Sequence, residues 1–122
     1  MSSYEQLLGF TPTRELMLAK LSALFPANEH SAVLAALDAF ESDDPHGRAR
    51  VQLAVLKLSA GRAESVPSLV QLAKLDYRDV LAPAEYPRQD AHGFASLDAL
   101  SETERQRLVQ EDRAQYLAWL RS

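Results

Sequence analysis

Acidic and hydroxyl-bearing side chains are concentrated in residues 74–87, which read KLDYRDVLAPAEYP. The two aspartates of this segment lie three residues apart, a spacing that brings both carboxylates onto one face of a helix. Such a pair could serve in acid/base catalysis or offer hard oxygen ligands to a metal ion. A tyrosine and a histidine follow and could contribute hydrogen bonds to a ligand. The candidate ligand or polar site therefore comprises Asp76, Asp79, Glu85, Tyr86 and His92.

The two aspartates also have a structural explanation. Asp76 and Asp79 fall near the predicted end of a helix, where negative charge interacts unfavourably with the helix dipole. An arginine from a neighbouring helix, such as Arg48 or Arg50, would compensate them. Three other charged residues of the segment are expected on a solvated face: Lys74, Arg78 and Glu85. Because structural ion pairs imitate functional sites, we favour structural pairing over catalysis.

Other residues that carry chemistry are dispersed along the chain. His30, His46 and His92 lie in separate segments without an HExxH pattern, so we predict no metal site. No serine lies in a GxSxG pattern, and several serines are explained as helix caps. The four glycines are isolated from one another, which argues against a glycine-rich phosphate loop. We therefore predict no catalytic residue and no cofactor.

Basic residues give only weak support for nucleic-acid binding. The net charge is −4, whereas phosphate recognition needs a basic face. The segment after Pro45 has some basic character, but its wide apolar face indicates burial, and no aromatic stacking platform adjoins it. Nucleic-acid binding is therefore not expected. The basic residues concerned are Arg48, Arg50, Lys57 and Arg62.

Helices are expected to position all of these residues. Apolar side chains recur at helical spacing, and alternating strand patterns are missing. We predict helices over about residues 2–9, 11–25, 28–40, 44–61, 65–82 and 101–120. Their expected starts are Ser2 with Glu5, Thr11 before Pro12, Asn28, Asp44 before Pro45, Ser65, and Ser101 with Glu104. Pro83 is expected to end or kink the fifth helix, and residues 86–100 show no clear periodicity.

Length and composition bound the class of protein. A chain of 122 residues has the usual size of one domain, so we predict a single all-α domain, a bundle of five or six helices. Cysteine is absent, which fits a reducing compartment. The first residues lack the basic region of a signal peptide, and Asp38 interrupts the richest apolar stretch. These features predict a cytoplasmic protein without a membrane span.

The last helix carries large apolar groups close to its end. Tyr116, Trp119 and Leu120 recur at helical spacing, and a frayed helix end rarely keeps such groups unless it docks. They could dock on the core of their own chain. They could also form an interface with a second subunit, where tryptophan and tyrosine are favoured. Both interpretations stay open at this point.

Two segments resemble a pattern in small bacterial helical proteins without an assigned function. The shared parts are LAVLKLSAG and AKLDYRDVLAPAEYP, within residues 51–87. The resemblance implies an all-α fold and a bacterial origin, and it carries over no catalytic residue. Pro83 departs from the bulkier residue expected at that position in the pattern.

The leading functional prediction is a small helical protein that acts through protein–protein contacts as a homo-oligomer. It rests on the wide apolar faces and on the aromatic residues of the last helix. The alternative is a small enzyme or ligand-binding protein with an acidic site around Asp76, Asp79 and Glu85. A pocket between helices lined by these carboxylates would favour the alternative.

Overall fold

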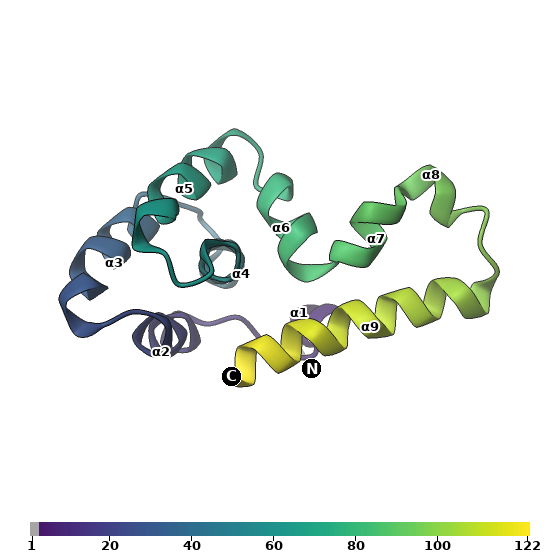
Figure 1. Cartoon of the computed structure of the whole chain (residues 1–122), viewed down its shortest axis with the longest axis horizontal. Helices are drawn as coiled ribbons and strands as arrows, with labels where there is room; N and C mark the ends of the chain where they lie inside the picture. Colours follow the sequence, from purple (N-terminus) through teal and green to yellow (C-terminus); the bar gives the residue numbers. More distant parts are fainter. Residues whose placement is uncertain (1–2) are drawn as a thin grey trace.

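The computed structural model describes residues 3–122, and this part of the chain is helical without a β-strand (Figure 1). The all-α prediction is therefore confirmed. The helices are α1 (Ser3–Leu8), α2 (Arg14–Leu24), α3 (His30–Asp38), α4 (Pro45–Ser59), α5 (Val66–Leu75), α6 (Arg78–Glu85), α7 (Pro87–His92), α8 (Phe94–Leu97) and α9 (Glu102–Arg121). Two 3-10 turns, η1 (Ala27–Glu29) and η2 (Ala63–Ser65), precede α3 and α5.

The predicted count of five or six helices is wrong, because residues 3–122 form nine. The predicted fifth helix is interrupted at Asp76, which adopts an extended backbone with φ −158° and ψ 106°. The Asp76 carboxylate accepts the backbone N–H of Arg78 at 3.1 Å, a local bond that competes with continuation of the helix. Residues 86–100, whose sequence shows no clear periodicity, contain α7 and α8. Pro83 does not end a helix, since α6 continues to Glu85.

Cap residues determine where several helices begin. Asp44 caps α4 by accepting the N–H of His46 at 3.1 Å, and Pro45 is the first helical residue, as predicted. Ser101 likewise caps α9 by accepting the N–H of Glu104 at 3.2 Å. The cap of α2 is Thr13, not Thr11, because Thr13 accepts the N–H of Leu16. The cap predicted at Ser2 lies outside the described residues.

Helix α4 lies at the centre of the molecule, with α2, α3, α5 and α6 around it (Figure 1). Its wide apolar face predicted burial, and this prediction is confirmed. The buried apolar residues of α4 are Ala49, Val51, Leu53, Ala54, Val55 and Leu56. All of them except Ala49 pack with Met17, Leu37, Val70 and Val80 from the surrounding helices in one cluster. We call helices α2 to α6 the body.

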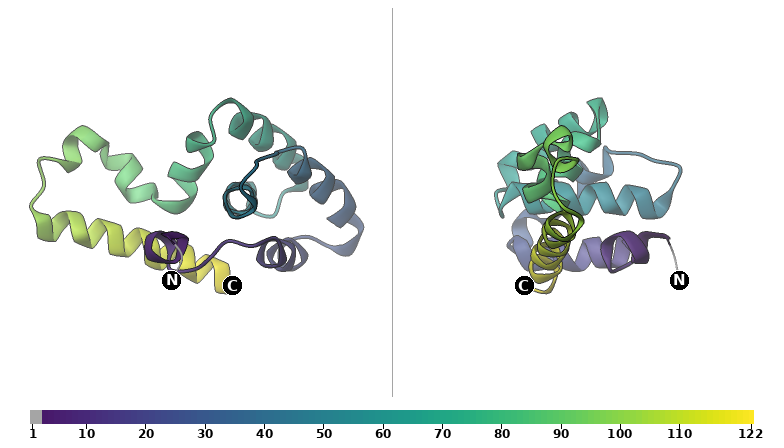
Figure 2. Two further views of the ribbon diagram at one scale, coloured as in Figure 1. Left: turned by 180° about the vertical axis from the view of Figure 1, so that it is seen from behind. Right: turned by 90° about the vertical axis from the view of Figure 1, so that its right-hand side faces the viewer.

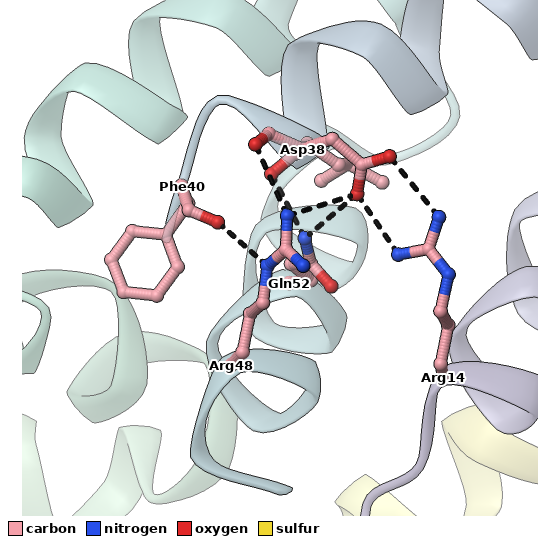
Figure 3. Close-up of polar contacts among 6 residues, drawn as sticks. Arg14, Asp38, Phe40, Arg48 and Gln52 are labelled. Atoms are coloured by element: carbon pink, nitrogen blue, oxygen red, sulfur yellow. Dashed lines mark hydrogen bonds and ion pairs between the residues drawn. The ribbon is translucent and has the colours of Figure 1, made fainter. Parts of the chain in front are cut away.

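One carboxylate joins three helices of the body (Figure 3). Asp38, the last residue of α3, accepts two hydrogen bonds from Arg14 of α2, at 3.0 and 3.1 Å. Arg48 of α4 donates to the Asp38 carboxylate at 3.4 Å and to the Phe40 carbonyl at 2.9 Å. The buried Gln52 donates to the Leu37 carbonyl at 2.9 Å. These donors satisfy carbonyls at the end of α3 and fix it against α4.

Helices α7 and α8 leave the body; α7 packs against the middle of α9, and α1 packs against the second half of α9 (Figures 1 and 2). Arg113 of α9 donates to the carbonyls of Gln6 and Leu7, which ties α1 to α9. Lys20 of α2 holds the end of α9. Its buried ammonium donates to the Trp119 carbonyl at 2.6 Å and to the Ser122 carbonyl at 3.0 Å.

Candidate functional site

The structure separates the two aspartates of the predicted site. Asp76 lies in the turn between α5 and α6, so it does not share a helical face with Asp79 as predicted. Its partner is the exposed Arg78, which donates to the carboxylate at 2.9 Å through both Nε and a terminal nitrogen. Hydrogen bonds from Arg78 hold the pKa of the Asp76 carboxyl below its usual range. Asp79 is exposed on α6, and neither aspartate lines a cavity with the other candidates.

Glu85 was expected in solvent, and this prediction is wrong. Its side chain is buried in the last turn of α6 and forms a bidentate pair with Arg50 of α4, at 2.7 and 2.8 Å. A bidentate charged pair of this kind is among the stronger hydrogen-bonded contacts in proteins. An arginine from α4 therefore does compensate a carboxylate of the segment, but the carboxylate is Glu85 rather than Asp76 or Asp79.

The Arg50–Glu85 pair lies at one wall of a cavity of about 350 Å³ between α1, α7, α8 and α9. We call this cavity the groove. Its apolar lining comes from Leu7, Leu8, Phe94, Val109 and Tyr116. Three of these large apolar side chains are exposed to solvent: Leu7 is 58%, Phe94 66% and Val109 38% exposed. The groove thus gathers apolar surface from three helices that are distant in sequence.

The polar lining of the groove consists mainly of groups that are already bonded. Asp112 of α9 is buried and accepts the backbone N–H groups of Arg88 and Gln89 at 3.0 and 3.1 Å. It also accepts the side-chain amide of Gln89 at 3.0 Å. Asp112 therefore acts as the cap that α7 lacks in its own sequence. Tyr86 adjoins this network and lines the groove; burial raises the pKa of its hydroxyl.

One polar atom beside the groove is not satisfied. The Tyr116 hydroxyl is buried and has no hydrogen-bond partner within residues 3–122. Its ring stacks on Phe10 at a centroid distance of 5.8 Å and meets Trp119 edge-on at 5.5 Å. Burial raises the pKa of this hydroxyl far above its usual value, so it stays a neutral phenol. Because buried polar groups normally find partners, this hydroxyl is an exception among the polar groups around the groove.

The remaining predicted residues lie as follows. His92 is exposed at the end of α7 and does not line the groove. Tyr116 is part of the core cluster, and Trp119 and Leu120 are partly buried against that cluster. The three residues of the predicted interface therefore dock on their own chain. Within residues 3–122, no three acidic or histidine side chains converge as a metal site, and no helix is long and apolar enough to span a membrane.

Sequence reasoning missed Asp112 and the three exposed apolar residues of the groove. A signal for Asp112 was present, because it stands in line with Leu108 and Tyr116 on the apolar face of α9. A carboxylate within an apolar stripe must be paired when that face is buried. Leu7, Phe94 and Val109 carried no comparable signal, since single apolar residues on a surface are common.

No protein-family model, curated protein or solved structure matches the chain.

Proposed function

We infer that this chain is a binding protein that takes a small, uncharged and mainly apolar ligand into the groove. The observation that carries this proposal is the convergence of Leu7, Phe94 and Val109 on one cavity while each stays well exposed. Large apolar patches on a soluble protein commonly mark interaction sites. A volume of about 350 Å³ lies at the lower end of the range for small-molecule sites, roughly 300–1,000 Å³.

The charges around the groove favour an uncharged ligand. Arg50 is neutralised by Glu85. Asp112 is enclosed by three N–H donors, and Arg113 is engaged with the carbonyls of α1. A charged ligand would therefore have to displace an existing contact or remain unpaired in a largely apolar site, which is unfavourable. A hydroxyl or carbonyl group on the ligand could bond Tyr86, whose hydroxyl has no bonded partner within residues 3–122.

The test uses N-phenyl-1-naphthylamine, an uncharged apolar dye, as the probe. Trp119, the single tryptophan, touches Tyr116 and reports binding through its fluorescence. We expect saturable binding that Phe94→Ser weakens about tenfold or more, because burial of an aromatic side chain contributes about 1.5–3 kcal/mol. Leu75→Ser is the matched control, since Leu75 is 85% exposed and lies outside the groove. Absence of saturation, or an equal loss in both variants, would refute the proposal.

Self-association is a second candidate function. Leu72, Leu75 and Tyr77 are exposed together around the turn between α5 and α6, and such a cluster suits contact between copies. The homo-oligomer stays a prediction. We now propose this turn as its contact surface, because Tyr116, Trp119 and Leu120 pack on their own chain. Sedimentation at high micromolar concentration tests it, and a monomer of 13.5 kDa would contradict it.

A cytoplasmic location remains part of the proposal on the composition alone, and cell fractionation tests it.

A further inference from the structure

A second cavity, of about 260 Å³, lies where α1, the start of α4 and the turn between α5 and α6 meet. Three aromatic side chains from separate parts of the chain line it: Tyr4, Phe40 and Tyr77. Tyr77 is 52% exposed, so its ring is available to a ligand. Val51 and Leu81 complete the apolar lining. We call this space the aromatic cavity; it is separate from the groove except that Arg50 borders both.

The position of Tyr4 in this wall is fixed by contacts to α4. Its hydroxyl donates to the Asp44 carboxylate at 2.5 Å, and its ring meets the imidazole of His46 at a centroid distance of 6.1 Å. A Cβ atom on Gly47 would come within 3.0 Å of the Asp44 carboxylate and 3.3 Å of the Tyr4 hydroxyl. Glycine at this position therefore leaves the room that the Tyr4–Asp44 contact needs. The Tyr4 part of the aromatic wall is consequently held in place without a ligand.

The aromatic cavity also carries one carboxylate that has no ion-pair partner within the described residues. Its charged lining residues are Asp44 and Arg50, and Arg50 is neutralised by Glu85. Asp44 accepts hydrogen bonds from Tyr4 and from the N–H of His46, but within residues 3–122 no lysine or arginine forms an ion pair with it. The His46 imidazole forms a hydrogen bond through Nδ1 with the Pro12 carbonyl at 2.8 Å. Aromatic faces and an unpaired carboxylate both attract a cation.

We propose that the aromatic cavity binds a small organic ammonium ion with methyl groups on the nitrogen. The methyl groups would contact the faces of Tyr4, Phe40 and Tyr77, which attract a cation through their π electrons. The Asp44 carboxylate would supply the counter-charge. A quaternary ammonium group suits this site better than a bare ammonium, because it needs no hydrogen-bond acceptors and loses less hydration. The cavity volume, about 260 Å³, fits a ligand of few heavy atoms.

The experiment compares choline with 3,3-dimethylbutan-1-ol, which has the same shape but carries carbon in place of the charged nitrogen. Both are titrated into the isotopically labelled protein at low salt, and chemical shifts are followed by NMR. We expect saturable shifts for the rings of Tyr4 and Tyr77 with choline, and binding of the uncharged alcohol that is about three- to thirtyfold weaker. Equal binding of the two compounds, or no saturable binding of choline, would overturn the proposal.

Variants locate the site independently of folding. Tyr77→Leu keeps an apolar side chain on an exposed position, and Asp44→Asn keeps a residue that caps helices as well as aspartate does. We expect each to weaken choline binding about threefold or more, with the urea midpoint of Tyr77→Leu unchanged. Phe94→Leu is the control, because it removes an exposed ring in the groove and should leave choline binding intact. An effect of Phe94→Leu as large as that of Tyr77→Leu would contradict the assignment.

Discussion

Large apolar side chains are mostly buried in the body, whereas several of them are exposed in the groove. In the body, the leucines and valines that pack around α4 are enclosed, although Leu72 and Leu75 at the end of α5 are exposed, and the polar groups of this core are bonded, as Asp38 and Gln52 are. In the groove, large apolar side chains remain open to solvent and the Tyr116 hydroxyl is unbonded. A region selected for stability alone should look like the body. The proposed binding of a ligand in the groove would explain this difference, because functional sites often sacrifice stability.

The largest expected difference between the two regions comes from one substitution made in each. Leu53→Ala removes a fully enclosed side chain of α4 and should lower the free energy of unfolding by about 2–5 kcal/mol. Leu7→Ala makes the same chemical change on the exposed rim of the groove and should cost less than about 0.5 kcal/mol. Urea denaturation of both variants measures the contrast. Equal costs would show that the rim is as tightly packed as the body.

Asp112→Ala tests how much the hydrogen bonds on the polar side of the groove contribute to stability, for comparison with the contacts of the body. The substitution leaves two backbone N–H groups of α7 and one side-chain amide without their acceptor. We expect a loss of about 1–3 kcal/mol and faster hydrogen exchange at the amides of Arg88 and Gln89. Glu111→Ala, at the adjacent half-exposed position, is the matched control and should change neither quantity appreciably. Unchanged exchange in Asp112→Ala would remove its assigned role as the cap of α7.

Lowering the pH should reduce the stability of the body, because it protonates the Asp38 carboxylate. Hydrogen bonds from Arg14 hold the pKa of the Asp38 carboxyl below its usual range. The folded state therefore binds this proton less readily than the unfolded state, whose pKa is about 3.9. Asp38 contributes stability above that pH, and the contribution disappears as the pH falls through the folded-state pKa. Unfolding free energies measured from neutral pH downward should show the parent and Asp38→Asn converging below about pH 4. A constant gap between them would contradict this account.

The smallest effect is expected at the turn between α5 and α6. Asp76→Asn removes a charge whose partner, Arg78, is exposed, so the urea midpoint should stay within error of the parent. Asp79→Asn should behave in the same way, because Asp79 is exposed and forms no ion pair within the described residues. A clear loss of stability in either variant would mean that a neighbour other than Arg78 depends on the charge.

The parts of the fold that follow from local sequence were predictable. Asp44 before Pro45 and Ser101 with Glu104 specify helix starts through bonds made within four residues, and these starts are confirmed. The interruption at Asp76 was not predicted, because the apolar spacing continues past it from Ala73 to Val80. There a local side-chain bond outweighs the periodic pattern.

The groove was beyond prediction from the sequence for a different reason. Its lining comes from α1, α4, α6, α7, α8 and α9, and only the tertiary arrangement brings these helices together. Glu85 and Tyr86 were among the candidates, but the chemistry around Glu85 depends on Arg50, 35 residues away. Spacing along a helix carries no information about such a partner. Tyr116 was noted for its size, while the lack of a partner for its hydroxyl is visible only in three dimensions.

The shared carboxylate of Asp38 makes the outcome of a mutation depend on the genetic background. Arg14 and Arg48 both point at this one group, and neither has another carboxylate partner within residues 3–122. In the parent chain, loss of either arginine removes a favourable contact. Once Asp38 is neutral, the same two cations face each other across its position, and replacing Arg14, which bonds only the Asp38 side chain, relieves repulsion. Arg48 still donates to the carbonyls of Asp38 and Phe40 in that background. A substitution at residue 14 is thus harmful in one background and tolerated in the other, so residues 14 and 38 are expected to change together.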